Sequence, residues 1–518
     1  MNGLRLDDLL RELPSDSTLT GDGGVRVRGV HQDSRRVSPG DLFVARRGGR
    51  SDGGAFVADA VRRGAAAVLT DFTAVVPVEV PCLRVADVRI GLALGAAAVY
   101  GHPAFTLDIV GVTGTNGKTT TTHLIRAAID GALGRPACGI IGTVGHSYRD
   151  FGADASHTTP EADELARLLR SMLDLGATHV AMEASSIALA SRRVHAIRFR
   201  VAAFTNLTQD HLDYHGDMEA YSSAKAELFT TYAPGSAVIH VGDRFGRELA
   251  KRVQAPLIRV SAQVGAPAAE AEVAPVTLAL SERGIDAMVR VPGGIVALRS
   301  PLLGVHNVEN LLVALGVVVA LDLDVARASL ALTHEIGAPG RLERCEEPGD
   351  DVVVLVDYAH TPDALARVLA TVRAVCKGRV LVVFGCGGDR DRQKRAPMGE
   401  AVGRTADVVV VTNDNPRNES PEAIAEPIAA GLDSCGQARI TPDVMPSVAR
   451  GYVVELDRAR AIELAVLAAR PGDTVVVCGK GHETYQIFGD TTVAFDDRAE
   501  ARRALSKRRA PEARSGGL

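Results

Sequence analysis

The sequence has little of several features that define major protein classes. Its seven cysteines are scattered without a Cys-x-x-Cys pair, which argues against a disulfide framework or a zinc site and is typical of reduced cytosolic thiols. No apolar run is long enough to span a bilayer. The net charge of −5 gives no reason to expect nucleic acid or an anionic membrane as a partner. We therefore expect a soluble, cytoplasmic protein, without a signal peptide because residues 1–10 are already charged and amphipathic.

Tryptophan is absent and aromatic residues make up only 4% of the chain, whereas 46% of the residues are hydrophobic. Abundant Ala, Gly and Val favour short buried strands that alternate with alanine-rich helices. A chain of 518 residues is too long for one hydrophobic core, so several domains are expected. Apolar patterns predict strands at 41–45, 66–70, 107–112, 179–182, 201–204, 237–241, 352–356, 380–384, 408–411 and 475–477, and antiparallel strands within 263–300.

Breaks that contain glycine and proline predict two domain boundaries, at 101–103 and at 337–340. We predict an α/β protein with a small N-terminal α/β domain over 1–103 and a central P-loop-type parallel sheet over 104–337. A C-terminal Rossmann-like, doubly wound sheet is expected over 338–505. The basic segment 506–518 is rich in Ala, Pro and Gly, and we predict that it is disordered.

Polar, glycine-rich segments repeatedly follow the predicted strands. They come after Val112, Met182, Phe204, Val356, Phe384, Val411 and Val477. In open parallel sheets ligands bind outside the carboxyl ends of the strands. We therefore expect the two large sheets to face a shared site.

The segment Gly-Val-Thr-Gly-Thr-Asn-Gly-Lys-Thr-Thr at 111–120 is the strongest local motif. Its glycines let backbone N–H groups close around phosphates, Lys118 can neutralise phosphate charge, and the Thr119 hydroxyl can bind Mg²⁺. A predicted strand precedes it and a predicted helix begins at about Lys118. Val112 stands where the usual Walker motif has its first glycine. The segment predicts a site for a nucleoside triphosphate.

The variant Gly-Thr-Asn-Gly-Lys-Thr resembles the Mur ligase family. Further matching segments follow in the family's order at 157–160, 183–186, 205–215, 221–225, 304–307, 339–341 and 357–362, and they span essentially the whole chain. Weaker matches to the family's uridine-diphosphate module occur at 33–35, 40–45 and Gly48. The resemblance implies an ATP-dependent ligase of peptidoglycan precursor synthesis that adds meso-diaminopimelate to the D-glutamate of UDP-N-acetylmuramoyl-L-alanyl-D-glutamate. It implies an acyl-phosphate intermediate, with ADP and phosphate as products.

The resemblance also implies roles for individual residues. The residues implied for catalysis are Lys118, Glu183, His211 and Lys225. Those implied for ATP are Gly114, Thr115, Asn116, Gly117, Lys118, Thr119, Thr120, His306, Asn310, Arg341, Asp357 and His360. Magnesium is expected on Thr119, Glu183, His211 and Lys225, with Lys225 carbamylated by CO₂. The peptide-linked uridine nucleotide is expected on Ser34, Thr158, Thr159, Ser185, Ser191 and Arg193, although relatives often have Gln at the position of Ser191.

Without the family pattern, several of these residues have plainer interpretations. Glu183 alone would be a solvated loop acid, His211 a hydrogen-bonded buried histidine, and Lys225 a solvated helical lysine. On helical periodicity, however, Tyr221, Ala224 and Phe229 could form an inward face beside Lys225.

The segment Asn-Asp-Asn-Pro-Arg-Asn-Glu at 413–419 alone reads as a structural turn. It matches the Asp-Asn-Pro-Arg motif of diaminopimelate-adding members. Diaminopimelate differs from lysine by a second carboxylate, which Arg417 can bind with its two-pronged guanidinium and Arg390 can assist. Glu483 can bind the distal ammonium, so lysine should be a poor substrate. The residues implied for diaminopimelate are Arg390, Asp414, Asn415, Pro416, Arg417, Asn418, Gly479 and Glu483.

Two other functions compete with this interpretation. One is a lysine-adding ligase of the same family, against which Arg417 argues. The other is a nucleotide-binding protein that lost catalysis, and phosphate release that requires both acceptor and amino acid would exclude it. A folylpolyglutamate synthase is less favoured, because those members of the family lack the uridine-diphosphate module. We further expect a monomer with a hinge near 335–341, because Arg341 could reach ATP only if the last domain closes.

Overall fold

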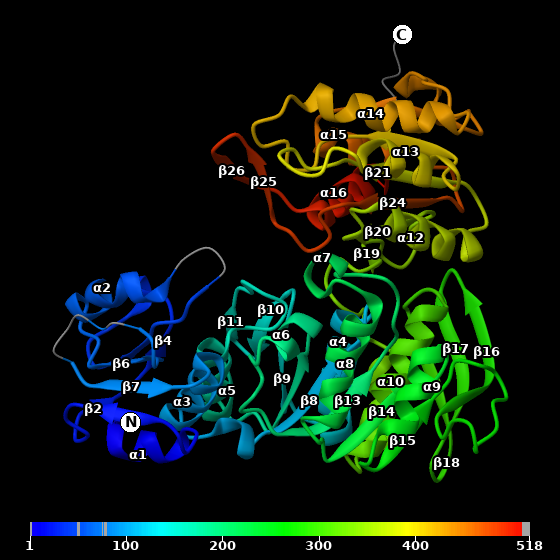
Figure 1. Cartoon of the computed structure of the whole chain (residues 1–518). Helices are drawn as coiled ribbons and strands as arrows, with labels where there is room; N and C mark the ends of the chain where they lie inside the picture. The colour runs from blue at the N-terminus through cyan, green and yellow to red at the C-terminus, as the bar shows by residue number, and fades with distance from the viewer. Residues whose placement is uncertain (1–2, 49–51, 75, 77–79, 510–518) are drawn as a thin grey trace. The chain divides into compact units, whose positions relative to one another are not determined.

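The computed structural model describes residues 3–48, 52–74, 76 and 80–509. Figure 1 shows a mixed α/β architecture built on several sheets, which confirms the predicted fold class. The chain forms two compact units. Unit 1 comprises Met1–Thr277, Ala287–Leu298 and Glu309–Thr333, and unit 2 comprises Leu278–Asp286, Arg299–Val308 and His334–Leu518. A separate domain over 1–103, and the boundaries of the predicted three-domain division, stay predictions.

The N-terminal part of unit 1 is a five-stranded sheet flanked by short helices. The four neighbouring strands β4 to β7 are parallel, and β2 is antiparallel at the edge. The order is β2 (Thr18–Thr20), β7 (Cys82–Val85), β6 (Ala67–Asp71), β5 (Leu42–Val44) and β4 (Val30–His31). The other elements are β1 (Leu4–Arg5), β3 (Arg26–Val27), α1 (Leu6–Glu12), α2 (Val57–Arg62) and α3 (Val88–Val99).

An eight-stranded sheet forms the centre of unit 1. Its order is β11 (Phe151–Ala153), β10 (Gly145–Tyr148), β9 (Cys138–Gly142), β12 (His179–Glu183), β8 (Asp108–Thr113), β13 (Phe199–Phe204), β14 (Ser236–His240) and β15 (Leu257–Val260). Six strands that are neighbours in this sheet are parallel to one another, namely β9, β12, β8, β13, β14 and β15. The helices of this region are α4 (Lys118–Leu133), α5 (Ala162–Asp174), α6 (Ser186–Ala190), α7 (Leu212–His215), α8 (Met218–Thr230), α9 (Arg244–Arg252), α10 (Val305–Ala320) and α11 (Val325–Leu332).

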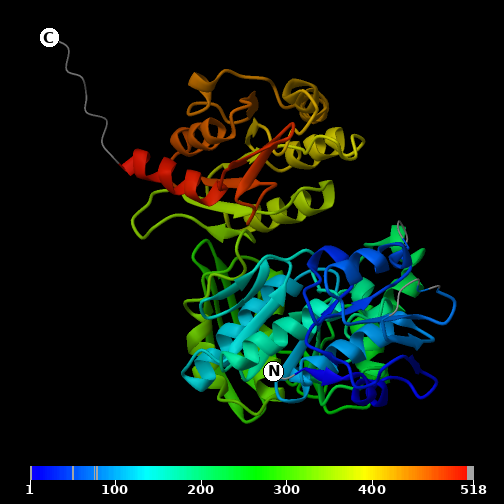
Figure 2. The same cartoon turned by 90° about the vertical axis from the view of Figure 1, so that its left-hand side faces the viewer.

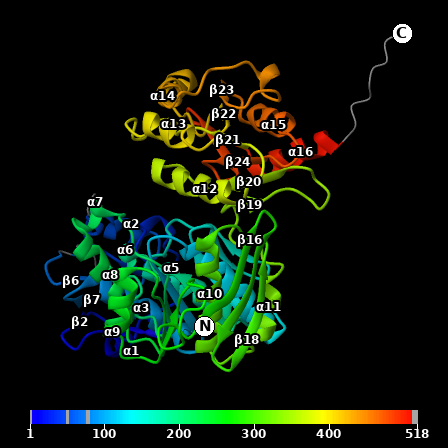
Figure 3. The ribbon, with the colours of Figure 1, turned by 90° about the vertical axis from the view of Figure 1, so that its right-hand side faces the viewer.

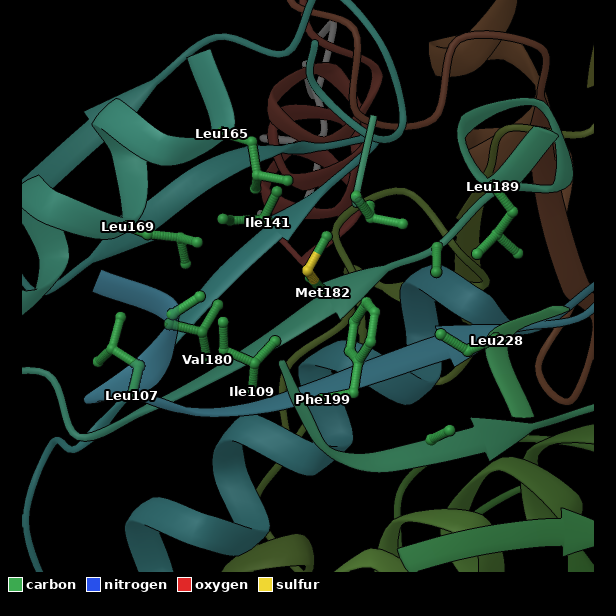
Figure 4. Packing of buried hydrophobic residues seen from close by; sticks show 14 of the residues in the cluster. Leu107, Ile109, Ile141, Leu165, Leu169, Val180, Met182, Leu189, Phe199 and Leu228 are labelled. Atoms are coloured by element: carbon green, nitrogen blue, oxygen red, sulfur yellow. The ribbon is translucent and has the colours of Figure 1, made fainter. Parts of the chain in front are cut away.

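The core of this sheet explains its register. Figure 4 shows Ile109, Val180 and Phe199 from three neighbouring strands in one buried apolar layer, with Leu165 and Leu169 of α5 packed against it. Val180 pairs with Ile109, and a one-residue slip would turn these side chains to the opposite face. This register brings the carboxyl ends of β8, β12 and β13 to the same edge of the sheet.

A second, smaller sheet contains β16 (Ala274–Ser281), β17 (Gly284–Val291) and β18 (Gly294–Ser300). Two-residue turns join these strands, and such turns require antiparallel neighbours. The antiparallel strands predicted within 263–300 are therefore confirmed.

Unit 2 is a doubly wound sheet in the order β19 (Glu343–Arg344), β20 (Val353–Asp357), β24 (Thr474–Cys478), β21 (Val380–Phe384), β22 (Val408–Val411) and β23 (Gly451–Val454). All neighbours from β20 to β23 are parallel. Figure 3 shows α12 (Pro362–Val375), α13 (Arg395–Gly403) and α14 (Pro421–Ser434) on one face, and α15 (Arg458–Ala468) and α16 (Asp497–Arg509) on the other. Helices on both faces require strands that are apolar on both sides, such as the Val-Val-Val-Val of β22.

The C-terminal segment corrects one prediction. Residues 506–509 are the last turn of α16, drawn in red in Figure 2, and are not disordered. Arg508 forms hydrogen bonds of 2.7 and 2.8 Å to the Asp351 carboxylate and also bonds the Val466 and Ala469 carbonyls. These tertiary bonds hold a basic segment that composition alone suggests is solvated. The rest of the predicted tail, 510–518, lies outside the described residues. Across the described part of the chain, no helix is long and apolar enough to cross a membrane.

Candidate active site

The predicted phosphate loop joins β8 to α4. Helix α4 begins at Lys118, and Gly117 before it has φ of 84°, a conformation open to glycine at little cost. A Cβ on Gly117 would collide with the Asn310 side chain, and a Cβ on Gly114 would collide with the Thr205 hydroxyl. The loop therefore requires glycine at both positions. Its backbone N–H groups and the α4 dipole provide the elements of an anion site.

Two lysines converge on one carbonyl of this loop. The Lys118 ammonium donates to the Gly114 and Thr115 carbonyls, both at 3.0 Å, and the Lys225 ammonium donates to the Gly114 carbonyl at 2.7 Å. Lys225 is only 1% exposed. Burial, and next the charge of Lys118, lower the pKa of Lys225 well below its ordinary value. The predicted inward face of α8 is confirmed, because Tyr221, Ala224, Lys225 and Phe229 are all buried.

Tyr221 supports this pair, and the sequence prediction did not include it among the site residues. The Lys225 nitrogen lies 4.4 Å from the centroid of the Tyr221 ring. The Tyr221 hydroxyl lies 3.1 Å from the Thr115 Oγ1, which in turn bonds the Thr208 carbonyl. A tyrosine four residues before the buried lysine, on the same helix face, was the available sign.

Glu183 ends β12 and is 1% exposed, so it is not a solvated loop acid. Its Oε1 accepts a 2.8 Å hydrogen bond from the backbone N–H of Thr143. The Thr143 hydroxyl donates to the Thr158 hydroxyl at 3.0 Å. Glu183 and Thr158, predicted for metal and for the peptide substrate respectively, are therefore linked through Thr143.

His211 lies at the start of α7 with φ of 51°, and its side chain is 45% exposed, so it is not a buried histidine. Its ring packs edge-on to Tyr221 with the centroids 6.2 Å apart. His211 is thus brought near the lysine pair through Tyr221, whereas Glu183 lies at the carboxyl end of β12, paired with Val112 of β8.

Most of the residues predicted for the peptide substrate already bind neighbouring groups. Thr159 is fully buried and donates to the Glu183 carbonyl, and the Ser185 hydroxyl caps α6 by accepting from Ala188 N–H. The Arg193 guanidinium donates to the Thr159 carbonyl at 3.0 Å and pairs with Glu161 at 2.8 Å. These bonds fix the loop that carries Thr158.

Two further predicted substrate contacts are also engaged within the fold. The Ser191 hydroxyl donates to the Ile187 carbonyl of its own helix at 2.6 Å. Ser34 is buried at the start of a 3₁₀ turn that Asp33 caps. Substrate roles for both residues stay predictions.

On α10, the Asn310 side chain accepts a hydrogen bond from the Thr121 hydroxyl and lies against Gly117. The structure thus brings Asn310 to the phosphate loop, as the ATP prediction requires. His306 is exposed and lies four residues before Asn310 on the same helix.

Within unit 2, the predicted ATP residues Arg341, Asp357 and His360 surround Tyr358. The Arg341 guanidinium lies 4.9 Å from the centroid of the Tyr358 ring, and the His360 ring packs edge-on to it at 4.7 Å. Asp357 accepts from Leu342 N–H at 2.8 Å and from Ala359 N–H at 2.7 Å, while burial raises its pKa. These contacts bring the three predicted residues together at the carboxyl end of β20.

Arg417, predicted to bind diaminopimelate, lies in the segment after β22 with φ of 52°. Its N–H donates to the Ile487 carbonyl of hairpin β25 (Tyr485–Phe488) and β26 (Thr491–Ala494), which the sequence prediction missed. One guanidinium nitrogen donates to the Gly388 carbonyl at 2.8 Å. That nitrogen and the side chain of exposed Arg390 both lie over Gly387. Exposed Asn418 instead donates to Asp389, while Pro416 is buried.

The remaining predicted diaminopimelate residues surround a lysine that was not predicted. Lys480 is 0% exposed, and its ammonium lies 3.1 Å from the Glu483 carboxylate, 3.4 Å from the Asp414 carboxylate and 3.1 Å from the Asn415 amide oxygen. Gly479, with φ of 121°, lies beside Asp414. The available sign was a lysine between two glycines directly after a buried strand.

The residues of unit 1 fit a magnesium-bound triphosphate. Two lysine nitrogens converge on the Gly114 carbonyl beside the N-terminus of α4, and such a concentration of N–H donors suits a polyphosphate. Magnesium is commonly held by one or two carboxylates together with substrate phosphates, so Glu183 and the Thr119 hydroxyl are suitable donors. Among the described residues, no three His, Cys, Asp or Glu side chains are grouped to hold a metal without such help.

Comparisons with known proteins agree with this geometry. Three family models match the chain: "Mur ligase family, catalytic domain" at 26–90, "Mur ligase middle domain" at 112–318 and "Mur ligase, glutamate ligase domain" at 340–481. The chain is 44% identical over 511 residues to the UDP-N-acetylmuramoyl-L-alanyl-D-glutamate–2,6-diaminopimelate ligase of Gloeobacter violaceus, covering 98% of this chain and 99% of the relative. It is 42% identical to the protein of the same name from Geobacter metallireducens, covering 97% and 98%.

A solved structure of a ligase with that name has 32% identity and a TM-score of 0.70, covering 98% of this chain and 99% of the other. The three models together cover most of the sequence, and the relatives align over nearly their full length. The chain belongs to the Mur ligase family.

Proposed function

We propose that this protein is an ATP-dependent ligase that joins meso-diaminopimelate to the D-glutamate carboxylate of UDP-N-acetylmuramoyl-L-alanyl-D-glutamate in peptidoglycan precursor synthesis. The observation that carries this proposal is the 44% identity over 98% of the chain to a ligase named for that reaction. ATP phosphorylates the carboxylate, and the amine then displaces phosphate to form the amide.

The phosphate loop supports ATP as the energy source. Lys118 lies at the first turn of α4, where its ammonium and the backbone N–H groups can neutralise the phosphates. Thr119 and Glu183 would hold Mg²⁺, which when bound offsets charge on the phosphate oxygens. The protein's own contribution is to place these groups before reaction, so that little reorganisation is needed.

The lowered pKa of Lys225 supports its carbamylation. Only a neutral amine attacks CO₂, and burial beside Lys118 favours the neutral form. The attack releases one proton and leaves a carbamate anion, whose oxygens are two bonds from the Lys225 nitrogen. That nitrogen lies less than about 6 Å from the Lys118 nitrogen, since both are within 3.0 Å of the same oxygen. Lys225 then attracts Lys118 and provides oxygen atoms suited to Mg²⁺.

The Asp414–Arg417 segment and Glu483 support an amino acid with an ionic far end. Arg417 can pair with a distal carboxylate, and the carboxylates of Asp414 and Glu483 can receive its ammonium. Lysine lacks the distal carboxylate and leaves the guanidinium without its partner, which disfavours lysine.

ADP release with the uridine-linked dipeptide and a panel of amino acids tests the proposal. We expect release that requires both substrates, with meso-diaminopimelate far better than lysine or ornithine. Equal kcat/KM for lysine and diaminopimelate would overturn the amino-acid assignment. ADP release without the dipeptide would overturn the ligase assignment.

A further inference from the structure

We propose that Lys480 is a positioning residue for amino-acid specificity, holding Asp414, Asn415 and Glu483 in the orientation and charge balance that receive the substrate's ammonium. The inference rests on the proposed function and extends it to a residue that is not itself expected to touch the substrate.

Lys480 is buried, and three side chains surround its ammonium. Its ammonium has three N–H donors, and the three acceptors of Asp414, Asn415 and Glu483 lie within 3.4 Å of it. The Tyr485 ring covers it, with the nitrogen 5.3 Å from the ring centroid. A fully buried ammonium is tolerated only when paired in this way.

Lys480 also fixes the orientation of the Asn415 amide. The amide oxygen accepts from both the Lys480 ammonium and the Ile487 N–H, each at 3.1 Å. The amide nitrogen consequently faces the Glu483 carboxylate at 3.4 Å. Two donors, the Lys480 ammonium and the Ile487 N–H, thus hold the amide oxygen and turn the amide nitrogen toward Glu483.

Charge balance gives the reason for a lysine here. Asp414 and Glu483 carry two negative charges and Lys480 carries one positive charge, so the cluster presents one net negative charge. One net negative charge matches the single positive charge of the substrate's distal ammonium, and Arg417 is left to pair with the substrate's distal carboxylate. Without Lys480 the two carboxylates would lose the cation that both contact and would repel each other.

The loops that carry these residues are also held independently of Lys480. Arg458 forms a fully buried ion pair with Asp497 at 2.6 Å and donates to the Asn413 and Cys478 carbonyls, both at 3.0 Å. These carbonyls directly precede Asp414 and Gly479. The backbone should therefore persist in a Lys480 variant, so that the side chains lose their orientation while the fold remains.

The test compares Lys480→Met and Lys480→Arg with the unaltered full chain. For Lys480→Met we expect KM for diaminopimelate to rise about 10- to 100-fold, because this is the change in affinity that corresponds to losing one hydrogen bond to a charged group. KM for ATP and for the dipeptide should stay near their original values. The acidic limb of log(kcat/KM) for diaminopimelate should move to higher pH, and Lys480→Arg should restore it. The other titratable or charged groups around the cluster remain in place, namely Tyr358, Cys386, Arg417, Arg458 and Tyr485.

Arg379→Met is the matched control, because it removes another buried cation, the partner of Asp473, from the amino-terminal edge of the same sheet. It should lower Tm without moving the pH profile for diaminopimelate. If Lys480→Met keeps the original KM and acidic limb, or if Arg379→Met moves them equally, the inference is overturned. If the unaltered protein does not use diaminopimelate, the proposed function fails first. If Lys480→Met does not fold, the test uses Lys480→Arg, which keeps the positive charge and should keep the original acidic limb. A shifted acidic limb in Lys480→Arg would then overturn the charge argument.

Discussion

Removing CO₂ from the assay is the most direct test of the lysine pair on the Gly114 carbonyl. The Lys118 and Lys225 nitrogens lie less than about 6 Å apart, because each is within 3.0 Å of that oxygen. At an effective dielectric constant of about 20, unit charges at that separation interact by about 3 kcal/mol. A carbamate on Lys225 attracts Lys118 by about that amount, whereas a neutral amine does not. An energy of about 3 kcal/mol corresponds to roughly 100-fold in the population of correctly placed Lys118.

ADP release is measured in degassed buffer and in the same buffer with bicarbonate, with ionic strength matched by chloride. We expect kcat/KM for ATP to fall by at least about 10-fold without CO₂, with roughly 100-fold as the upper bound, and to recover on addition of bicarbonate. Lys225→Glu, which carries a permanent carboxylate, should retain some activity that bicarbonate does not change. Lys225→Arg, a permanent cation, should be less active than the unaltered protein in degassed buffer.

Lys251→Arg, on the exposed face of α9, is the control for the substitution itself and should match the unaltered protein. Equal activity with and without bicarbonate, together with near-normal kcat in Lys225→Arg, would refute the carbamate and the electrostatic argument.

Three further predictions follow from single positions. Arg417→Lys keeps the charge but loses the guanidinium fork, so kcat/KM for diaminopimelate should fall about 10- to 100-fold with little gain for lysine, and an unchanged ratio of the two in the ADP-release panel would contradict this. Gly117→Ala puts a side chain at φ of 84° against Asn310, so ADP affinity measured by calorimetry should fall by about 1–3 kcal/mol, whereas an equal Kd would show that the loop has room. Burial lowers the pKa of His123 to about 3 from 6.5, so the unfolded chain binds the extra proton and the free energy of unfolding should fall between pH 6.5 and pH 3. Urea titrations should show that the free energy of unfolding of His123→Gln depends less on pH over that range than that of the unaltered protein. An identical pH dependence in the two proteins would show that other groups cause the acid sensitivity.

Local pattern was sufficient for much of unit 1. The glycine loop, the start of α4 at Lys118 and the inward face of α8 follow from short-range spacing, because turn conformation and helix periodicity are local properties. The continuous apolar runs of unit 2 likewise predicted β20, β21, β22 and β24, since strands covered on both faces need no polar alternation.

Other features depend on partners far along the chain. Lys480 has no helical or strand periodicity, and its partners Asp414 and Asn415 lie 66 and 65 residues away in sequence. Helix α16 continues through a segment of disordered composition because Arg508 bonds Asp351, 157 residues earlier. Tertiary contacts of this kind override local propensity and cannot be read from composition.

The lysines of the two candidate sites also differ in a way that bears on function, and of these Lys225 and Lys480 are buried whereas Lys118 is half-buried. In unit 1, two lysine nitrogens converge on the Gly114 carbonyl at the N-terminus of α4. In unit 2, two carboxylates share the ammonium of Lys480, which leaves an excess of negative charge. The N–H donors of the first site favour an anionic ligand, and the carboxylates of the second favour a cationic one. A polyanion at the first site and an ammonium at the second are the combination that a ligase joining an ATP-activated carboxylate to an amine requires.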